Sequence, residues 1–210
     1  MRLNQKDNYA NAKTQIINNK KIEIMSTRIE TLNPETTTGK SKELFNAVQS
    51  KLGFIPNLIK VFGTSPATSQ TYLSLGELTA SGNFNNKFRE QLALAIAEEN
   101  ACNYCLSAHT TIGKMNGLTI EETEKNRQGI AADAKTQAGL QFAQTVTKNR
   151  GQVSTEVINT VKEAGYNDGD ILEIVLNVVS NTLTNYVNHI AETEVDFPSV
   201  ETGKFTVTAN

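Results

Sequence analysis

Two thiols and an imidazole stand close together near the middle of this 210-residue chain. Cys102 and Cys105 are its two cysteines, and His109 is one of its two histidines. If Cys102 begins a helix, Cys105 and His109 follow at positions i+3 and i+7, so that the three side chains share one helical face. The positive end of the helix dipole favours a thiolate there, a second thiol can form a disulfide with it, and an imidazole can accept or return a proton. The spacing therefore predicts thiol redox chemistry.

Other interpretations of the cysteines remain open. A C-x-x-C pair can be half of a zinc site, but only three donors are local here, so His189 or a carboxylate has to complete the four ligands. Both cysteines can also be inert core residues. A structural disulfide framework is excluded, because a bond between residues three apart closes too small a loop to restrict the unfolded chain.

A polar line is expected on the helix that carries His189. This histidine lies four residues after Asn185 and eight after Asn181, a spacing that places all three on one face. The line either faces a substrate or is a hydrogen-bonded helix face near a subunit contact.

The segments around the cysteines predict an all-α fold, a compact multi-helix bundle. Aromatic residues make up only 6% of the chain and tryptophan is absent, so the core has to be built mainly from aliphatic side chains. The run from Leu92 to Ala97 is apolar on every face, which is typical of a helix buried all round. Glu90 lies one turn before Leu94, so we expect its carboxylate to face inward. Asn100 is expected to end this helix in the left-handed conformation.

Capping residues and apolar stripes predict further helices. Ser41 is expected to cap the first of them, and the sequence from Thr119 to Glu122 has the pattern of a capping box. Including the two central helices, the expected ranges are 42–52, 56–62, 66–81, 85–100, 102–115, a polar helix from 119, 134–148, 157–164 and 168–187.

Composition and charge exclude several functions and bound the domain. With a formal charge of −2, the chain has no net positive electrostatic field that would attract a polyanion, so no nucleic-acid partner is expected. There is no apolar leader and no run of about eighteen apolar residues, so we expect a cytoplasmic protein without a membrane partner. Residues 1–30 are predicted to be a disordered or non-native extension, 31–198 one helical domain, and 199–210 a C-terminal tail.

A known family shares the central signature. Glu90, eleven intervening residues, Cys102-Asn103-Tyr104-Cys105, three further residues and His109 resemble the motif of the alkylhydroperoxidase D-like branch of the carboxymuconolactone decarboxylase superfamily. The segment REQLALAIAEENACNYCLSAH resembles that family's paired helices, and GYNDGDILEIVLNVVSNTLTNYVNH resembles the helix that ends its domain. The resemblance spans roughly one domain, residues 31–198.

The resemblance implies an antioxidant, thiol-dependent oxidoreductase that reduces hydroperoxides. It implies that Cys105 attacks the peroxide as a thiolate and becomes a sulfenic acid, which Cys102 resolves as a disulfide. His109, linked to Glu90, relays the proton. An external dithiol or a lipoylated protein restores the thiols, no cofactor or metal is required, and the protein forms a homo-oligomer, a trimer or a hexamer. Physical reasoning adds that Cys102, at the helix start, should be the more exposed sulfur.

Several features leave the function open. Tyr104 stands where some family members have a second polar relay residue, and it can hydrogen-bond or simply pack. Glu98 and Glu99 can supplement Glu90, or be solvated charges before a helix end. A redox-sensing or binding protein of the same fold, and a carboxymuconolactone decarboxylase-like enzyme, are the alternative functions.

Overall fold

The computed structural model describes residues 28–205, and this part of the chain consists of nine helices joined by turns and loops, without a strand. The predicted all-α fold is confirmed. Residues 1–27, which include nearly all of the predicted N-terminal extension, and residues 206–210 lie outside the described part. The helices are α2 (Gly39–Leu52), α3 (Asn57–Phe62), α4 (Pro66–Ala80), α5 (Asn86–Glu99), α6 (Asn103–Met115), α7 (Ile120–Arg127), α8 (Ala134–Lys148), α9 (Thr155–Glu163) and α10 (Asp168–Ala191).

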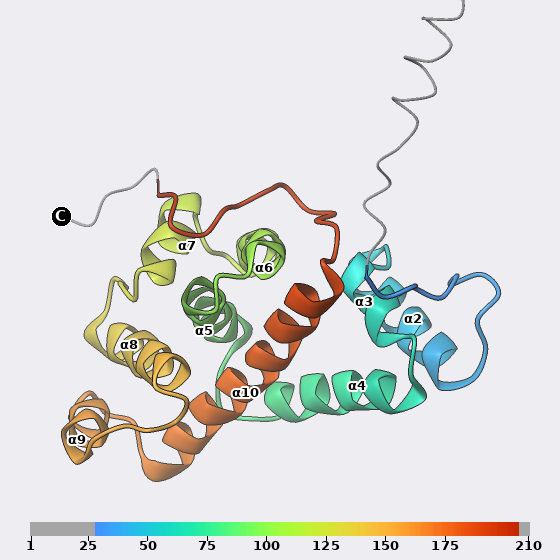
Figure 1. The fold of residues 1–210 in the computed structure, drawn as a ribbon. Helices are drawn as coiled ribbons and strands as arrows, with labels where there is room; N and C mark the ends of the chain where they lie inside the picture. The colour runs from blue at the N-terminus through green and yellow to red at the C-terminus, as the bar shows by residue number, and fades with distance from the viewer. Residues whose placement is uncertain (1–27, 206–210) are drawn as a thin grey trace, which may run out of the picture.

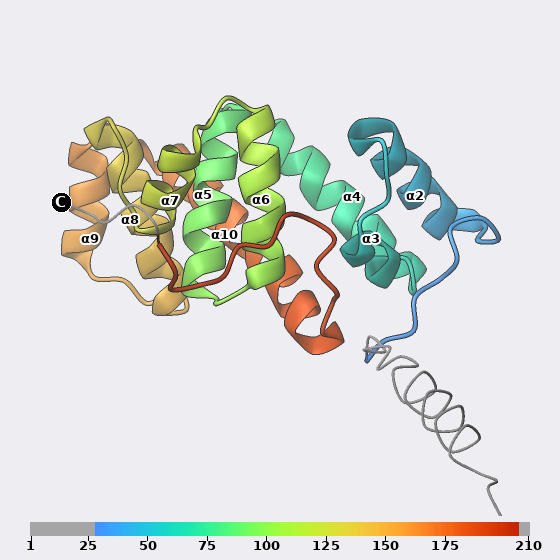
Figure 2. The same cartoon turned by 90° about the horizontal axis from the view of Figure 1, so that it is seen from above.

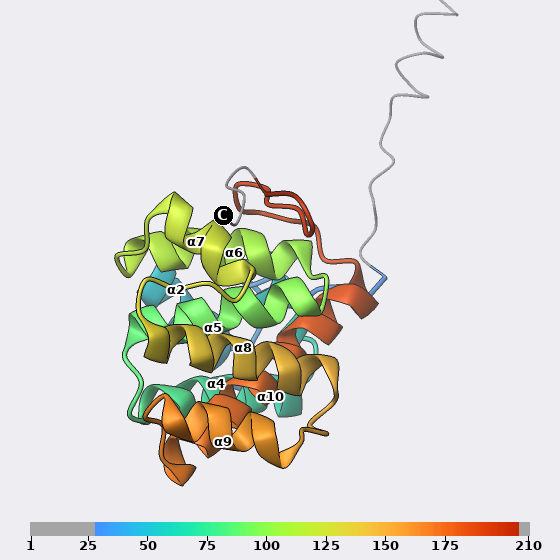
Figure 3. The ribbon, with the colours of Figure 1, turned by 90° about the vertical axis from the view of Figure 1, so that its left-hand side faces the viewer.

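Helix α5 is the centre of the fold. It contacts α6, α7, α8 and α10, and Figure 3 shows α6 and α7 on one side of it and α10 on the other. The helix predicted to be buried on every face is confirmed, since each residue from Leu92 to Ala97 is at most 2% exposed. Burying such a run of aliphatic side chains stabilises the fold by roughly 1.5 to 3 kcal/mol for each large one.

Two apolar clusters flank α5. One joins it to α2, α3 and α6 and includes Leu44, Phe62 and Leu106. The other joins it to α8, α9 and α10 and includes Leu140 and Ile174. In Figures 1 and 2 the group α2 to α4 therefore lies on one side of the α5, α6 and α10 core, with α8 and α9 on the other. Both cysteines belong to the first cluster.

The helix ends follow the sequence in most places, although α9 begins two residues earlier and α10 ends four residues later than predicted. Two further departures concern the residues expected to cap or end a helix. Thr119 forms the predicted capping box with Glu122. By contrast, α2 begins earlier than predicted, at Gly39, because the hydroxyl of Ser41 is buried and donates instead to the backbone oxygen of Gly63 at 2.6 Å. The left-handed residue between α5 and α6 is Ala101, with φ of 54°, and not Asn100.

The segment after α10, residues 193–205, crosses α6 and ends beside α7 (Figures 1 and 2). Its backbone N–H groups are held by side chains of the helices: Val200 donates to Ser107 Oγ at 2.9 Å, and Thr202 donates to Asn103 Oδ1 at 2.9 Å. We call residues 193–205 the C-terminal strap. Among the described helices, none combines the length and the apolar character that a bilayer-spanning helix requires.

Candidate active site

Cys102 and Cys105 lie where α6 begins. Cys102 caps the helix, and its Sγ accepts a hydrogen bond from the backbone N–H of Cys105 at 3.3 Å. Both thiols are free, and the two residues are 1% and 2% exposed. The expectation that Cys102 is the more exposed sulfur is therefore wrong, because α10 and the C-terminal strap cover this end of α6.

A side-chain amide from α10 reaches both sulfurs. Nδ2 of Asn188 lies 3.2 Å from Sγ of Cys105 and 4.0 Å from Sγ of Cys102. Asn185, one turn earlier, acts to lower the pKa of the Cys105 thiol, and its Oδ1 accepts a hydrogen bond from Nδ2 of Asn100 at 2.8 Å. The polar face of α10 thus borders the thiols, although the sequence gives no signal that separates Asn188 from the other polar residues of this helix.

The imidazole of His109 is held by the carboxylate of Glu90. Nδ1 and Oε2 are 2.8 Å apart, and the two side chains are only 21% and 16% exposed. The prediction that Glu90 faces inward is confirmed by this contact. Because Nδ1 is bonded to Glu90, Nε2 is the ring nitrogen left for proton exchange.

Two opposing influences set the pKa of His109. Burial lowers it, but the carboxylate of Glu90, through both its charge and its hydrogen bond, and the negative charge of Cys102 outweigh burial and raise the pKa of His109 above its ordinary value. The imidazole is therefore well suited to carry a proton at neutral pH.

The two thiols have opposite pKa shifts. The hydrogen bond from the Cys105 thiol is the main cause that lowers the pKa of Cys102, and the Cys105 backbone N–H and the charge of His109 act in the same direction against burial. Burial is the main cause that raises the pKa of Cys105, and the neighbouring Cys102 adds to it. The pair therefore places its first negative charge on Cys102, at the helix N-terminus, with Cys105 protonated beside it.

Cys105 and His109 line a cavity of about 740 Å³ between α2, α3, α4, α6 and α10, whereas Cys102 does not reach it. Apart from His109, the charged residues of the lining are Lys40, Glu43, Lys51 and Glu77. Its apolar wall includes Val48, Leu52, Leu58, Ile59, Leu73, Leu75, Ile112, Leu183 and Phe197. A mainly apolar cavity of this volume suits an organic molecule.

Tyr72, on α4, is another polar residue of the cavity. Its ring packs against Phe62, with the centroids 5.1 Å apart. Burial, and then the negative charges of Glu90 and Cys105, raise the pKa of Tyr72 to about 12, so its hydroxyl stays protonated and can donate a hydrogen bond. Tyr72 lies 30 residues before Cys102, and no sequence pattern connects the two.

Solved structures share this fold. An uncharacterized peroxidase-related protein with the alkylhydroperoxidase AhpD core, from Ralstonia eutropha JMP134, is 20% identical with a TM-score of 0.72, over 81% of this chain and 93% of its own. A peroxidase-related protein from Silicibacter sp. TM1040 is 20% identical with a TM-score of 0.71, over 80% and 90%. A cysteine-to-alanine variant of the debrominase Bmp8, in complex with 2,3,4-tribromopyrrole, is 15% identical with a TM-score of 0.70, over 82% and 93%.

A family model matches the segment that carries the site. No curated protein matches the chain, but residues 66–145, which include Glu90, both cysteines and His109, match the model of the carboxymuconolactone decarboxylase family. The four residues of the predicted signature come from α5, α6 and the residue that caps α6. They form two neighbouring pairs: the backbone N–H of Cys105 donates to Sγ of Cys102, and the imidazole of His109 contacts the carboxylate of Glu90.

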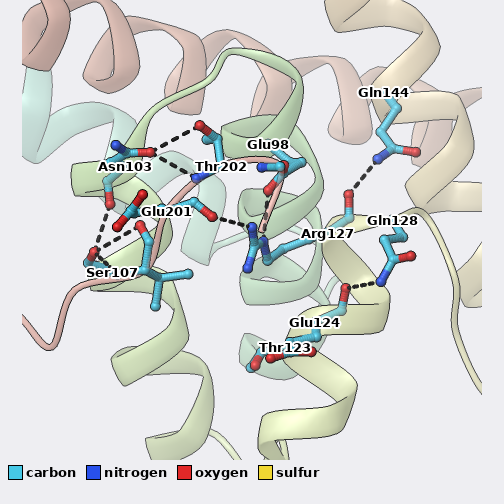
Figure 4. Close-up of polar contacts among 12 residues, drawn as sticks. Glu98, Asn103, Ser107, Thr123, Glu124, Arg127, Gln128, Gln144, Glu201 and Thr202 are labelled. Carbon is cyan, nitrogen blue, oxygen red and sulfur yellow. Dashed lines mark hydrogen bonds and ion pairs between the residues drawn. The ribbon is translucent and has the colours of Figure 1, made fainter. Parts of the chain in front are cut away.

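Three polar residues near the signature have structural partners. Tyr104 is buried, and its hydroxyl donates to Asp196 at 2.8 Å and accepts from the backbone N–H of Leu58 at 3.2 Å. Glu98 forms an ion pair with the buried Arg127 at 2.7 Å (Figure 4). His189 contacts the backbone oxygen of Asn100 through Nε2 at 2.9 Å.

These partners favour a supporting role over a chemical one. Tyr104 ties α6 to the C-terminal strap, and Arg127 also donates to the backbone oxygen of Glu201 at 2.7 Å (Figure 4). Between residues 28 and 205, no group of three His, Cys, Asp or Glu side chains is arranged to hold a metal ion. Cys102, Cys105 and His109 thus do not form such a group.

We predict that Glu90→Gln weakens the His109 pair in a pH-dependent way. Because the pKa of His109 is raised in the folded protein, the charged pair contributes its full stabilisation at pH values below the unfolded-state pKa of histidine. This stabilisation is lost as the pH rises through the folded-state pKa. The substitution should therefore cost about 1 to 2 kcal/mol near pH 6 and much less near pH 9. Urea unfolding at the two pH values measures the difference.

An NMR titration of the imidazole provides an independent readout of the same substitution. The His109 resonance should titrate at lower pH in Glu90→Gln than in the parent protein, with the His189 resonance as an internal reference. Equal stability losses at both pH values, together with an unmoved His109 titration, would contradict the pairing.

Proposed function

We propose that this chain is a thiol-dependent peroxidase that reduces organic hydroperoxides through Cys102 and Cys105. The observation that carries the proposal is a pair of free thiols, joined by the hydrogen bond from the Cys105 backbone N–H to Sγ of Cys102, near an imidazole–carboxylate pair and with one sulfur facing an apolar cavity. A hydroperoxide takes two electrons from a thiolate without help from a bound cofactor. The peroxidase-related names of two structural neighbours agree with this chemistry.

In the first step, Cys105 attacks the terminal oxygen of the hydroperoxide as a thiolate. A sulfur–oxygen bond forms and the oxygen–oxygen bond breaks, so the sulfur is oxidised by two electrons to a sulfenic acid and an alkoxide leaves. The imidazolium of His109, held by Glu90, gives its proton to the alkoxide, and the product is an alcohol.

In the second step, Cys102 resolves the sulfenic acid. The neutral imidazole accepts the proton of the Cys102 thiol, the resulting thiolate attacks the sulfur of Cys105, and hydroxide leaves. The imidazolium returns its proton to the hydroxide as water. One hydroperoxide and two thiols thus become one alcohol, one water and an intramolecular disulfide.

An external dithiol restores the pair. Two successive exchange reactions reduce the Cys102–Cys105 disulfide and leave the reductant as its own cyclic disulfide. Because both cysteines are buried and Cys105 faces the cavity, the reductant has to be small or to carry its dithiol on a slender arm. A lipoylated protein has such an arm.

We predict that one equivalent of cumene hydroperoxide removes both free thiols and leaves an intramolecular disulfide, and that added dihydrolipoamide sustains turnover. Cys105→Ser should lower turnover by at least about 10³-fold, because no sulfur then faces the peroxide. Cys102→Ser should form a sulfenic acid that dimedone traps, without recycling. Thiol counts by mass spectrometry and steady-state peroxide consumption measure these outcomes.

Two outcomes of this experiment count against peroxidase activity. If both thiols stay free after hydroperoxide treatment, the proposal fails. If a disulfide forms but peroxide consumption stops after one turnover with the dithiol present, the pair acts as a redox switch, and the sensor function replaces the enzyme.

A second candidate is reductive removal of a halide from a small aromatic compound. The debrominase Bmp8 variant that shares this fold holds tribromopyrrole, and the cavity beside Cys105 is large enough for such a ring. The overall reaction converts an aryl bromide and two thiols into the arene, a disulfide, bromide and a proton.

We predict that the peroxidase assay mixture, with tribromopyrrole in place of peroxide, releases less than one bromide per active site. Sustained bromide release would make dehalogenation the main activity.

We also propose that the chain forms a homo-oligomer through the outer face of α10. Leu172, Val179, Tyr186 and Ile190 lie on one side of this helix and are each more than half exposed. Their spacing of seven, seven and four residues is that of a helix–helix seam. An apolar stripe of this length is unfavourable in water unless a partner covers it.

We predict that light scattering gives a mass that is a multiple of 23.0 kDa and that a Val179→Lys, Tyr186→Lys double variant has the mass of one chain. The lysines place two charges in the seam, where burial is costly. The matched control is Asn159→Lys with Thr160→Lys, two exposed positions on α9, which should leave the oligomer intact. A monomeric parent protein would refute the interface.

A further inference from the structure

The redox step contains an electrostatic conflict that the cysteines do not resolve by themselves. Cys105 faces the cavity, whereas the charge of the resting pair belongs to Cys102, which does not line it. A buried thiol beside a thiolate is doubly disfavoured as an anion, by desolvation and by the like charge. Some other group has to favour the charge on Cys105 at the moment of attack.

Asn188 is placed to supply that stabilisation. Its Nδ2 is 3.2 Å from Sγ of Cys105 and 4.0 Å from Sγ of Cys102, so its donor is nearer to the cavity-facing sulfur. The side chain is 5% exposed, so little water competes for the hydrogen bond. An amide N–H that donates to an anion in a low-dielectric site is stronger than one that donates to a neutral thiol.

The rest of this amide indicates that the contact with sulfur is what keeps it there. Oδ1 of Asn188 is buried and has no hydrogen-bond partner among the described residues. The same holds for Nδ2 of Asn185, one turn earlier on α10. A buried polar atom without a partner costs free energy, so a leucine of similar size would suit a purely structural position better.

We propose that Asn188 is a catalytic residue, whose amide N–H stabilises negative charge on Cys105 and so lets the proton of the Cys105 thiol pass to Cys102. The transfer changes Cys105–SH beside a Cys102 thiolate into a Cys105 thiolate beside Cys102–SH, with no change in net charge. The inference extends the proposed function, since it identifies how the cavity-facing sulfur becomes the nucleophile. The other titratable groups that face this pair are His109, with Glu90 behind it, Tyr72 and Tyr104.

Alkylation of Cys105 by iodoacetamide tests the proposal without peroxide. The reagent is small enough for the cavity, and mass spectrometry identifies the modified sulfur. In a Cys102→Ser background, adding Asn188→Leu should slow alkylation of Cys105 near pH 7 about tenfold, the effect of one pKa unit on thiolate population. The pH profile of the rate and the ultraviolet absorbance of the thiolate should both move to higher pH.

Asn177→Leu is the matched control. Asn177 lies on the same helix and is equally buried at 5%, but its Nδ2 donates to the backbone oxygen of Glu173 at 2.8 Å and not to a sulfur. The control should change the alkylation rate less than twofold. Asn188→Asp, which keeps the shape of the side chain and replaces the donor by a negative charge, should slow alkylation further and serves if Asn188→Leu does not fold.

The outcomes separate the two proposals. If Asn188→Leu or Asn188→Asp alkylates at the parent rate, or if Asn177→Leu slows the reaction as much, the role of Asn188 is refuted. If the alkylation results hold but hydroperoxide leaves the parent thiols untouched, the peroxidase function fails while the role of Asn188 at the sulfur stands.

Discussion

The burial of α5 on every side is the constraint on which the molecule depends. A helix with neighbours all round can carry very few polar groups, and each one has to find a partner inside the protein. Two of its carboxylates do so, one in the first half of the helix and one in its last turn. Glu90 holds His109, and Glu98 holds Arg127 together with the backbone N–H of Gly203. The first positions the imidazole beside the thiols, and the second fastens the C-terminal strap over them.

The charge distribution at the site follows from the direction of α6. The helix begins at the cysteines, so its N-terminal N–H groups favour an anion at Cys102, while Cys105 lies one turn deeper, where burial opposes charge. Cys102 is thus the sulfur that ionises more easily, whereas Cys105 is the sulfur that faces the cavity. A thiol pair of this kind needs donors from a different helix, and α10 provides them.

Much of this arrangement was predictable from local patterns. The apolar run at Leu92, the spacing of Cys102, Cys105 and His109, and the inward direction of Glu90 are all consequences of helical periodicity, which a sequence displays directly. The caps were predictable where a side chain bonds its own helix, as at Thr119. Ser41 was assigned the wrong partner, because its hydroxyl bonds a backbone oxygen 22 residues away.

What the sequence did not reveal depends on contacts between distant segments. Asn188 and Tyr72 reach the site only because α10 and α4 pack beside α6, and neither has a motif of its own. The burial of Cys102 was missed for the same reason. A helix start is normally open to solvent, and here a segment about a hundred residues later covers it.

The late position of Asn188 also affects how the protein is made. A ribosome synthesises the two cysteines more than 80 residues before the amide that contacts them and the strap that covers them. Until those segments emerge, the thiols of the nascent chain are ordinary exposed cysteines, open to oxidation or modification by any reagent in the cell. The enclosed pair with its divided charge is therefore among the last features of the molecule to be assembled.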